Sequence, residues 1–188
     1  MTKNHRTVLF IAQAAVIAAL YAGVTLALGA TPIHWISYGP VQFRIAEAFT
    51  MLAALTPAAI PGLTIGTFFA NLGSPYGWFD WVFGTLASLL AAICSWQLRH
   101  ATIDLLFRWK DKSFINIANM PWLSGLPPVI FNALVVPVII ITAAGLEWSI
   151  FPLFAAQVAL GQFVVVYALG MPLLAALRKT RIFNETER

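Results

Sequence analysis

Residues 8–28, VLFIAQAAVIAALYAGVTLAL, form an apolar run without a single charged side chain. At 1.5 Å per residue, a helix of this length crosses about 30 Å of hydrocarbon. The run is longer than the roughly 7–15 apolar residues of a secretory signal peptide. We therefore expect residues 8–28 to be the first membrane-spanning helix.

The composition of the whole chain supports a membrane protein. Of 188 residues, 60% are apolar and 10% are charged, whereas soluble domains are about half apolar and a quarter charged. A globule of this size buries too little surface to hide so many apolar side chains from water. We expect an all-α membrane protein in which lipid covers the excess, with residues 1–188 forming a single domain.

Further apolar segments follow, separated by turns rich in Gly and Pro. They are predicted at residues 42–55, 62–72, 78–98, 122–141 and 151–177. The segments at 42–55 and 62–72 are short and are expected to form a helical hairpin, because Pro57 and Pro61 interrupt the chain between them. The sequence thus predicts a bundle of six transmembrane helices.

The positions of the basic residues predict the orientation of the chain in the membrane. Ten of the eleven Lys and Arg residues lie in three clusters, at positions 3–6, 99–112 and 178–188. An even number of spans places all three clusters on one side, which the positive-inside rule assigns to the cytoplasm. We expect both termini there, and this placement explains the positive net charge without nucleic-acid binding.

Four charged residues lie outside these clusters, and all map to the outer side of the predicted bundle: Arg44, Glu47, Asp80 and Glu147. Polar groups near the hydrocarbon are costly and usually face a cavity or a partner. Carboxylates accept hydrogen bonds from paired N–H groups, and aromatic rings stack on planar ligands. The sequence therefore predicts an outward-facing site for a planar, nitrogen-rich ligand.

Structural alternatives exist for several of these residues. Arg44 and Glu47 are spaced i,i+3 and are candidates for an ion pair within one helix. Asp80 is a candidate N-cap of the fourth span. Trp78 fits the aromatic belt at a membrane interface. Inside the spans, Asn132 lies between two prolines, where freed backbone groups favour a cavity, and it is the strongest neutral candidate.

Small residues recur every four positions along the first span. One row contains Ala14, Ala18 and Ala22, and the neighbouring row contains Ala15, Ala19 and Gly23. Such rows let a second helix approach closely. They predict either internal packing or a docking surface for a separate membrane subunit.

The sequence lacks the motifs that are typical of several classes of enzyme. There is no phosphate-binding loop of the Walker type, no H-E-x-x-H and no G-x-S-x-G motif. The single cysteine, Cys94, rules out a cysteine metal cluster. We expect no enzyme activity, no metal and no cofactor. A secondary transporter driven by an ion gradient stays open as an alternative.

The run from Tyr38 to Thr50, YGPVQFRIAEAFT, resembles the Q-F-R-x-S-E-A-L-T signature of the QueT family. Further similar segments follow in order at residues 58–63, 71–72, 80–87 and 127–133, so the likeness extends over roughly residues 8 to 170. This chain departs from the signature at Ala46, which replaces the usual Ser, and at Phe49, which replaces Leu. The missing hydroxyl beside Glu47 bears on ligand preference.

The resemblance implies a substrate-binding (S) component of an energy-coupling factor (ECF) importer for 7-deazaguanine precursors of queuosine, in the bacterial cytoplasmic membrane. Its expected partners are an EcfT-like transmembrane coupling subunit, docked on Ala14, Ala15, Ala18, Ala19 and Ala22, and two ATP-binding cassette subunits. Such a component is expected to deliver its ligand by tilting in the membrane. An S component for another vitamin or nucleobase is the alternative.

The same resemblance leads to expected roles for individual residues. Glu47 is expected to accept from the guanine-like edge of the ligand, and Arg44 to orient Glu47 or bind the ring carbonyl. Asp80 is expected to meet a ligand ammonium or to hold the pocket wall. The remaining ligand-binding candidates supply neutral hydrogen bonds or a stacking face: Asn71, Asn132, Gln157, Tyr38 and Trp78.

Overall fold

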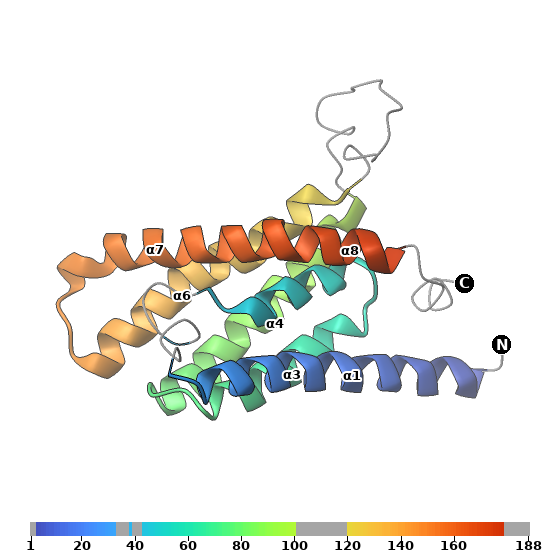
Figure 1. Ribbon diagram of the computed structural model, residues 1–188, viewed down its shortest axis with the longest axis horizontal. Coiled ribbons are helices and arrows are strands. Elements are labelled where there is room, and N and C mark those ends of the chain that lie inside the picture. The colour runs from blue at the N-terminus through green and yellow to red at the C-terminus, as the bar shows by residue number, and fades with distance from the viewer. Residues whose placement is uncertain (1–2, 33–37, 39–42, 101–119, 179–188) are drawn as a thin grey trace, which may run out of the picture.

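The computed structural model describes residues 3–32, 38, 43–100 and 120–178, except for the side chains of Lys3 and His100. All regular structure in these ranges is helical, which confirms the all-α prediction. The helices lie along one another in an elongated bundle (Figure 1). The expected start of the second span, at residue 42, lies outside the described residues.

The described part of the chain contains six continuous helical segments, three of which combine α-helix with a 3₁₀ or π-helical stretch. In order they are α1 (Lys3–Gly29), the 3₁₀ helix η1 (Ile45–Ala54), α3 (Ala59–Asn71), the π-helix η2 (Asp80–Gly84) with α4 (Thr85–Gln97) and η3 (Leu98–His100), η5 (Trp122–Gly125) with α6 (Leu126–Ala144), and η6 (Trp148–Ile150) with α7 (Phe151–Val164), the π-helix η7 (Val165–Gly170) and α8 (Met171–Arg178). They correspond to the six predicted spans.

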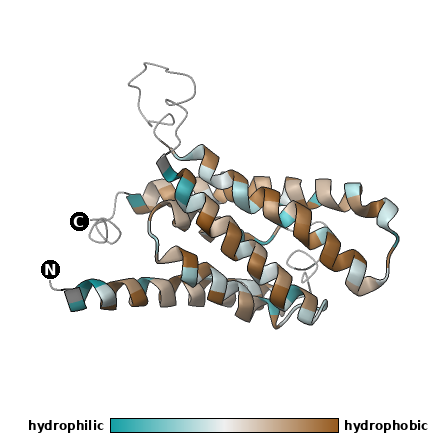
Figure 2. Ribbon diagram, turned by 180° about the vertical axis from the view of Figure 1, so that it is seen from behind, coloured by the Kyte–Doolittle hydropathy of each residue, from teal (hydrophilic) through white to brown (hydrophobic). Residues whose placement is uncertain are grey.

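Three of these segments are long and apolar enough to cross a membrane by themselves: Asn4–Gly29, Trp122–Ala144 and Trp148–Arg178. Large apolar side chains cover their outer surfaces, as shown by Val8 at 65% exposed and Leu160 at 62%. Figure 2 shows this hydrophobic colouring along the helices, with hydrophilic residues at the N-terminal end of α1. Lipid is the solvent that such a surface requires.

The first residue of α1 and the last residue of α8 lie at the same end of the bundle (Figure 1). Arg178 also approaches Met120 there, with 3.8 Å between its Nη1 and the methionine sulfur. An even number of spans requires this arrangement. The basic residues gathered at this end place it in the cytoplasm by the positive-inside rule.

The second segment differs from the expected α-helix, because η1 is a 3₁₀ helix over all ten of its residues. With three residues per turn, side chains three positions apart lie on the same face. Glu47 and Thr50 therefore share a face, and the Thr50 hydroxyl donates to the Glu47 carbonyl at 2.6 Å. Both side chains are buried.

Helices α1 and α3 pack at very short range because glycines of α3 meet alanines of α1. A Cβ atom placed on Gly62 would lie 2.8 Å from the Ala14 carbonyl oxygen, and one on Gly66 would lie 2.9 Å from that of Ala18. The row of Ala14 and Ala18 therefore serves internal packing. Ala15 and Ala19, in the neighbouring row, are exposed.

We expect Gly66→Ala to lower the free energy of unfolding by about 1–3 kcal/mol, because the new methyl group forces two helix backbones apart. Gly23→Ala on α1 is the matched control, since a Cβ there meets nothing within 4 Å and alanine favours the helix. Thermal unfolding in detergent measures both. Equal stability of the two variants would contradict the packing described here.

Candidate ligand-binding site

The central group of the site is the Glu47 carboxylate, which lies on η1 and is only 2% exposed. Its Oε1 accepts a 2.6 Å hydrogen bond from the hydroxyl of Tyr21 on α1. No described residue donates a hydrogen bond to Oε2, although this atom is buried. A buried acceptor without a partner is costly, so Oε2 is a candidate contact for a ligand.

Arg44 lies just before η1 and pairs with α3 rather than with Glu47. Its Nη2 donates to Asn71 Oδ1 at 2.8 Å, and no ion pair with Glu47 forms among the described residues. The i,i+3 ion pair that the spacing allowed is therefore absent. Arg44 is 7% exposed, and its buried Nε has no hydrogen-bond partner in the described ranges.

Asn71 connects Arg44 to the segment that contains Asp80. While its Oδ1 accepts from Arg44, its Nδ2 donates to the Asp80 carbonyl oxygen at 2.9 Å. Asp80 is buried inside a helical segment and makes no capping hydrogen bond, so the N-cap alternative is wrong. Gly84 leaves room for this arrangement, because a Cβ there would collide with Asp80 Oδ1 and approach Asn71 Nδ2 at 2.7 Å.

Asn132 on α6 and Gln162 on α7 are two further buried polar residues of the bundle. Asn132 precedes Val136 by four residues and Gln162 follows Val158 by four, and these two valines pack in one buried cluster with Ile140. On η1, the neighbour of Glu47 is Ala48, whose backbone lies against Gly170.

Asn132 and Gln162 thus add neutral polar groups to the interior that contains Glu47. Asn132 is 7% exposed and near enough to Glu47 to act on its carboxylate. Gln162 is 1% exposed, and its Oε1 has no hydrogen-bond partner among the described residues. The cluster of Val136, Ile140 and Val158 supplies apolar side chains beside them. The arrangement offers hydrogen bonds inside apolar walls, as small-molecule sites usually do.

Tyr38 packs at the ends of α1 and α3, where a Cβ on Gly29 would lie 2.8 Å from its ring. Its hydroxyl donates to the Ala70 carbonyl at 2.8 Å, and its own carbonyl accepts from Tyr76 at 2.9 Å. The Arg44 guanidinium carbon lies 5.3 Å from the centre of its ring. Tyr38 and Tyr76 are thus held by contacts within the protein and form a cover over this end of α1 and α3.

Both tyrosines of this cover remain neutral donors. Burial raises the pKa of Tyr38, and the nearby Arg44 lowers it in part. Burial also raises the pKa of Tyr76, and the Asp80 carboxylate raises it further. Neither phenol therefore loses its proton near neutral pH, and both hydrogen bonds persist.

Two of the predicted ligand-binding residues lie apart from the group around Glu47. Trp78 is 56% exposed, and its ring stacks on Phe79 with 4.1 Å between centroids. Gln157 is half-buried on α7, with Oε1 unpaired among the described residues. The sequence interpretation did not select Tyr21 or Gln162. Both could have been found from the sequence, because Tyr21 and Gln162 place a phenol and an amide within apolar spans, where polar groups need a partner.

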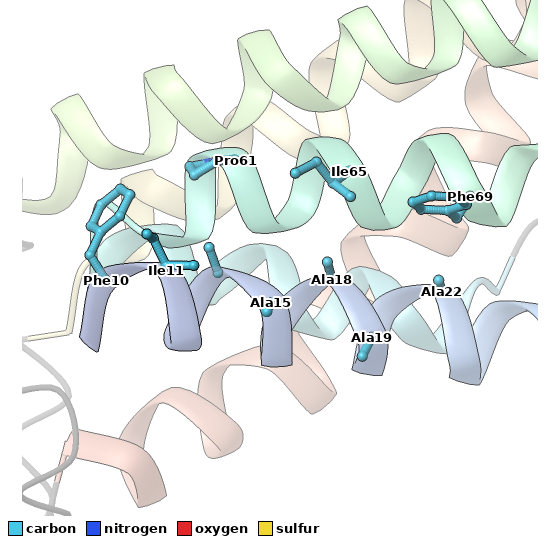
Figure 3. A pocket seen from close by; sticks show the side chains of 10 residues that line it. Phe10, Ile11, Ala15, Ala18, Ala19, Ala22, Pro61, Ile65 and Phe69 are labelled. Carbon is cyan, nitrogen blue, oxygen red and sulfur yellow. The ribbon is translucent and has the colours of Figure 1, made fainter. Parts of the chain in front are cut away.

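A second feature is an apolar groove between α1 and α3 on the outer surface of the bundle. Its volume is about 550 Å³, and Phe10 and Ile11 line one end. Figure 3 shows Ala18 and Ala22 of α1 directed toward the helix that carries Pro61, Ile65 and Phe69, and Ala19 on the side of α1 away from it. All five alanines predicted to dock a partner line this groove: Ala14, Ala15, Ala18, Ala19 and Ala22.

Comparison with known proteins places this chain in a family. Residues 11–179 match the family described as QueT transporter. The chain belongs to the QueT transporter family. The stretch from 11 to 179 contains the signature around Glu47, both alanine rows and the segments with Asn71, Asn132 and Gln162, so family membership covers every part of the site.

A curated relative agrees with this assignment. The queuosine precursor transporter QueT of Lactococcus lactis subsp. cremoris (strain MG1363) is 37% identical over 76 residues, which are 40% of this chain and 43% of the relative. The matched stretch thus spans less than half of the relative's length. No solved structure matches the chain. Together with its apolar helices, membership of the QueT transporter family makes the chain a multi-pass protein of the bacterial membrane.

Asn71 and Asn132 are expected to contribute differently to the stability of the ligand-free protein. Asn71→Ala removes two hydrogen bonds between protein groups and should lower the unfolding free energy by roughly 1–3 kcal/mol. Asn132→Ala removes a single interaction, with the Glu47 carboxylate, and should cost less. Thermal unfolding of both ligand-free variants tests this contrast, and a larger loss for Asn132→Ala would contradict it.

Proposed function

We propose that this chain is the substrate-binding subunit of an ATP-driven, ECF-type importer for 7-deazaguanine precursors of queuosine. The observation that carries the proposal is the buried, unpaired Oε2 of Glu47 among other buried polar groups. Membership of a transporter family, and a relative named for queuosine precursors, support it.

The free atoms of the site complement a guanine-like edge. Such an edge presents N–H donors, for which Glu47 Oε2 and Gln162 Oε1 are free acceptors. It also presents a ring carbonyl, for which Arg44 Nε is a free donor. Charge-assisted hydrogen bonds of this kind are among the stronger ones, and the dry surroundings raise the cost of leaving any of them unmade.

The charges of the site favour neutral or cationic ligands over anions. Arg44 contributes +1, while Glu47 and Asp80 contribute −2, so these three buried residues sum to −1. Neutral 7-cyano-7-deazaguanine and the positively charged 7-aminomethyl form both suit this balance, with Asp80 as the partner for the ammonium. An anion would meet net repulsion in a low dielectric.

Binding of the ligand to the purified chain is the direct test. We expect calorimetry in detergent to show binding of queuine, 7-cyano-7-deazaguanine or 7-aminomethyl-7-deazaguanine. Glu47→Gln should weaken it by roughly 10- to 150-fold, since a charge-assisted hydrogen bond is lost.

Glu147→Gln is the matched control, because Glu147 is exposed in the turn before α7. It should bind as the native chain does. A well-folded protein that binds none of these bases would overturn the proposed substrate and leave the fold intact. In that case other vitamins and nucleobases become the candidates for an S component.

The groove between α1 and α3 supports the second half of the proposal, which is docking of an EcfT-like coupling subunit that works with two ATP-binding cassette subunits. Small side chains there admit another helix at close range. Docking on α1 would let the subunit tilt and expose its site to the cytoplasm while the internal contacts of Glu47 are kept.

Ala19→Leu fills this groove without entering the core, because Ala19 is exposed. We expect it to lower uptake in cells that contain the coupling subunits by at least roughly tenfold, as close helix packing is lost, and to leave ligand binding unchanged. Ala156→Leu, on the exposed surface of α7, is the matched control. Unchanged uptake in Ala19→Leu would contradict docking at this surface.

The buried Glu47 and Asp80 also favour a second candidate, a solitary transporter coupled to protons, since ionisable residues within membrane bundles often form proton paths. Proteoliposomes separate the two. Accumulation by the chain alone under a pH gradient would support the second candidate, whereas accumulation only with the coupling subunits and ATP would support the first.

A further inference from the structure

The orientation of the Glu47 carboxylate is set by residues on other helices. Of its two carboxylate oxygens, Oε1 accepts from Tyr21 and Oε2 has no described partner. Arg44, the nearest cation in the sequence, is directed to Asn71. The carboxylate is therefore held by groups on other helices: the Tyr21 hydroxyl on α1 bonds it at 2.6 Å, and Asn132 on α6 lies close to it.

Tyr21 is itself fixed from several sides. It is 0% exposed, and its Cβ lies against Gly66, where an added methyl group would come within 3.0 Å. Its carbonyl oxygen accepts from the Thr25 hydroxyl at 2.9 Å. Thr67 on α3 lies beside its hydroxyl. Tyr21 is thus enclosed on all sides, and its hydroxyl reaches Glu47 Oε1 at 2.6 Å.

We propose that Tyr21 is a positioning residue that determines specificity by holding the Glu47 carboxylate with Oε2 directed to the ligand. This inference rests on the proposed function. With Oε1 occupied, Oε2 becomes the acceptor for the exocyclic 2-amino group of a 7-deazaguanine. Sites that hydrogen-bond a substrate N–H reject analogues that lack it, because a buried group is left unpaired.

Loss of the Tyr21 hydroxyl has a defined consequence for this discrimination. In Tyr21→Phe the carboxylate keeps its charge but loses the donor that sets its rotation. Oε2 then no longer meets the 2-amino group in a fixed geometry, so the advantage of ligands that have this group declines. A purely structural role for Tyr21 would weaken both kinds of ligand equally.

The test compares two ligands: whichever of the three precursors the native chain binds most tightly, and its analogue without the 2-amino group. The ratio of their dissociation constants is measured by calorimetry for each variant. We expect a large ratio for the native chain and a roughly tenfold smaller ratio for Tyr21→Phe. Because it is a ratio, it is independent of how much of each variant is folded.

Two controls isolate the contact. Tyr167→Phe removes a comparable hydrogen bond, from the phenol to the Trp122 carbonyl at 2.8 Å, and should leave the ratio unchanged. Glu47→Gln should reduce the ratio, and adding Tyr21→Phe to it should reduce the ratio no further, since both act through one contact.

The outcomes separate this inference from the proposed function. If the native chain binds a precursor but Tyr21→Phe keeps the native ratio, the role of Tyr21 is overturned and the function stands. A further fall in the double variant would likewise overturn it. If the native chain binds no 7-deazaguanine, the proposed function fails and the inference fails with it.

Discussion

A carboxylate enclosed by helices within a membrane is stable only where polar groups compensate for the loss of water. In this chain that condition organises the interior around Glu47. Tyr21 from α1 reaches its Oε1, and Asn132 from α6 lies close to it. The 3₁₀ geometry of η1 places Thr50 on the same face, where its hydroxyl donates to the main-chain carbonyl of Glu47. Among the described residues, no group donates a hydrogen bond to Oε2 of the carboxylate.

Helix α1 connects the two features on which the proposed function depends. Its inner face places Tyr21 against Glu47, while its outer face lines the groove with alanines. Gly62 and Gly66 let α3 approach α1 at backbone contact distance. Close packing of this sort has low compressibility and transmits strain between the packed elements.

The sequence predicted the helical class and the approximate spans, and it singled out Glu47, Arg44, Asn71 and Asn132, because apolar runs and isolated polar residues are local signals. The structure buries these four side chains, and their roles in ligand binding stay predictions. The sequence did not predict the pairing of these residues, since the choice of Asn71 over Glu47 by Arg44 depends on how α3 packs. Tyr21 was missed for the same reason, as its partner is 26 positions away. The spacing of the alanines did predict two rows, but only the packed structure shows that Ala14 and Ala18 meet α3 while Ala15 and Ala19 remain exposed.

The central claim is that ligand binds at Glu47, Asn132 and Gln162, inside the bundle. A structure of the chain determined with a bound 7-deazaguanine tests this claim most directly. The account predicts that a ligand N–H group lies within hydrogen-bonding distance of Glu47 Oε2, with Tyr21 still bonded to Oε1. A ligand bound elsewhere, with Oε2 still unpaired or satisfied by another protein group, would contradict it.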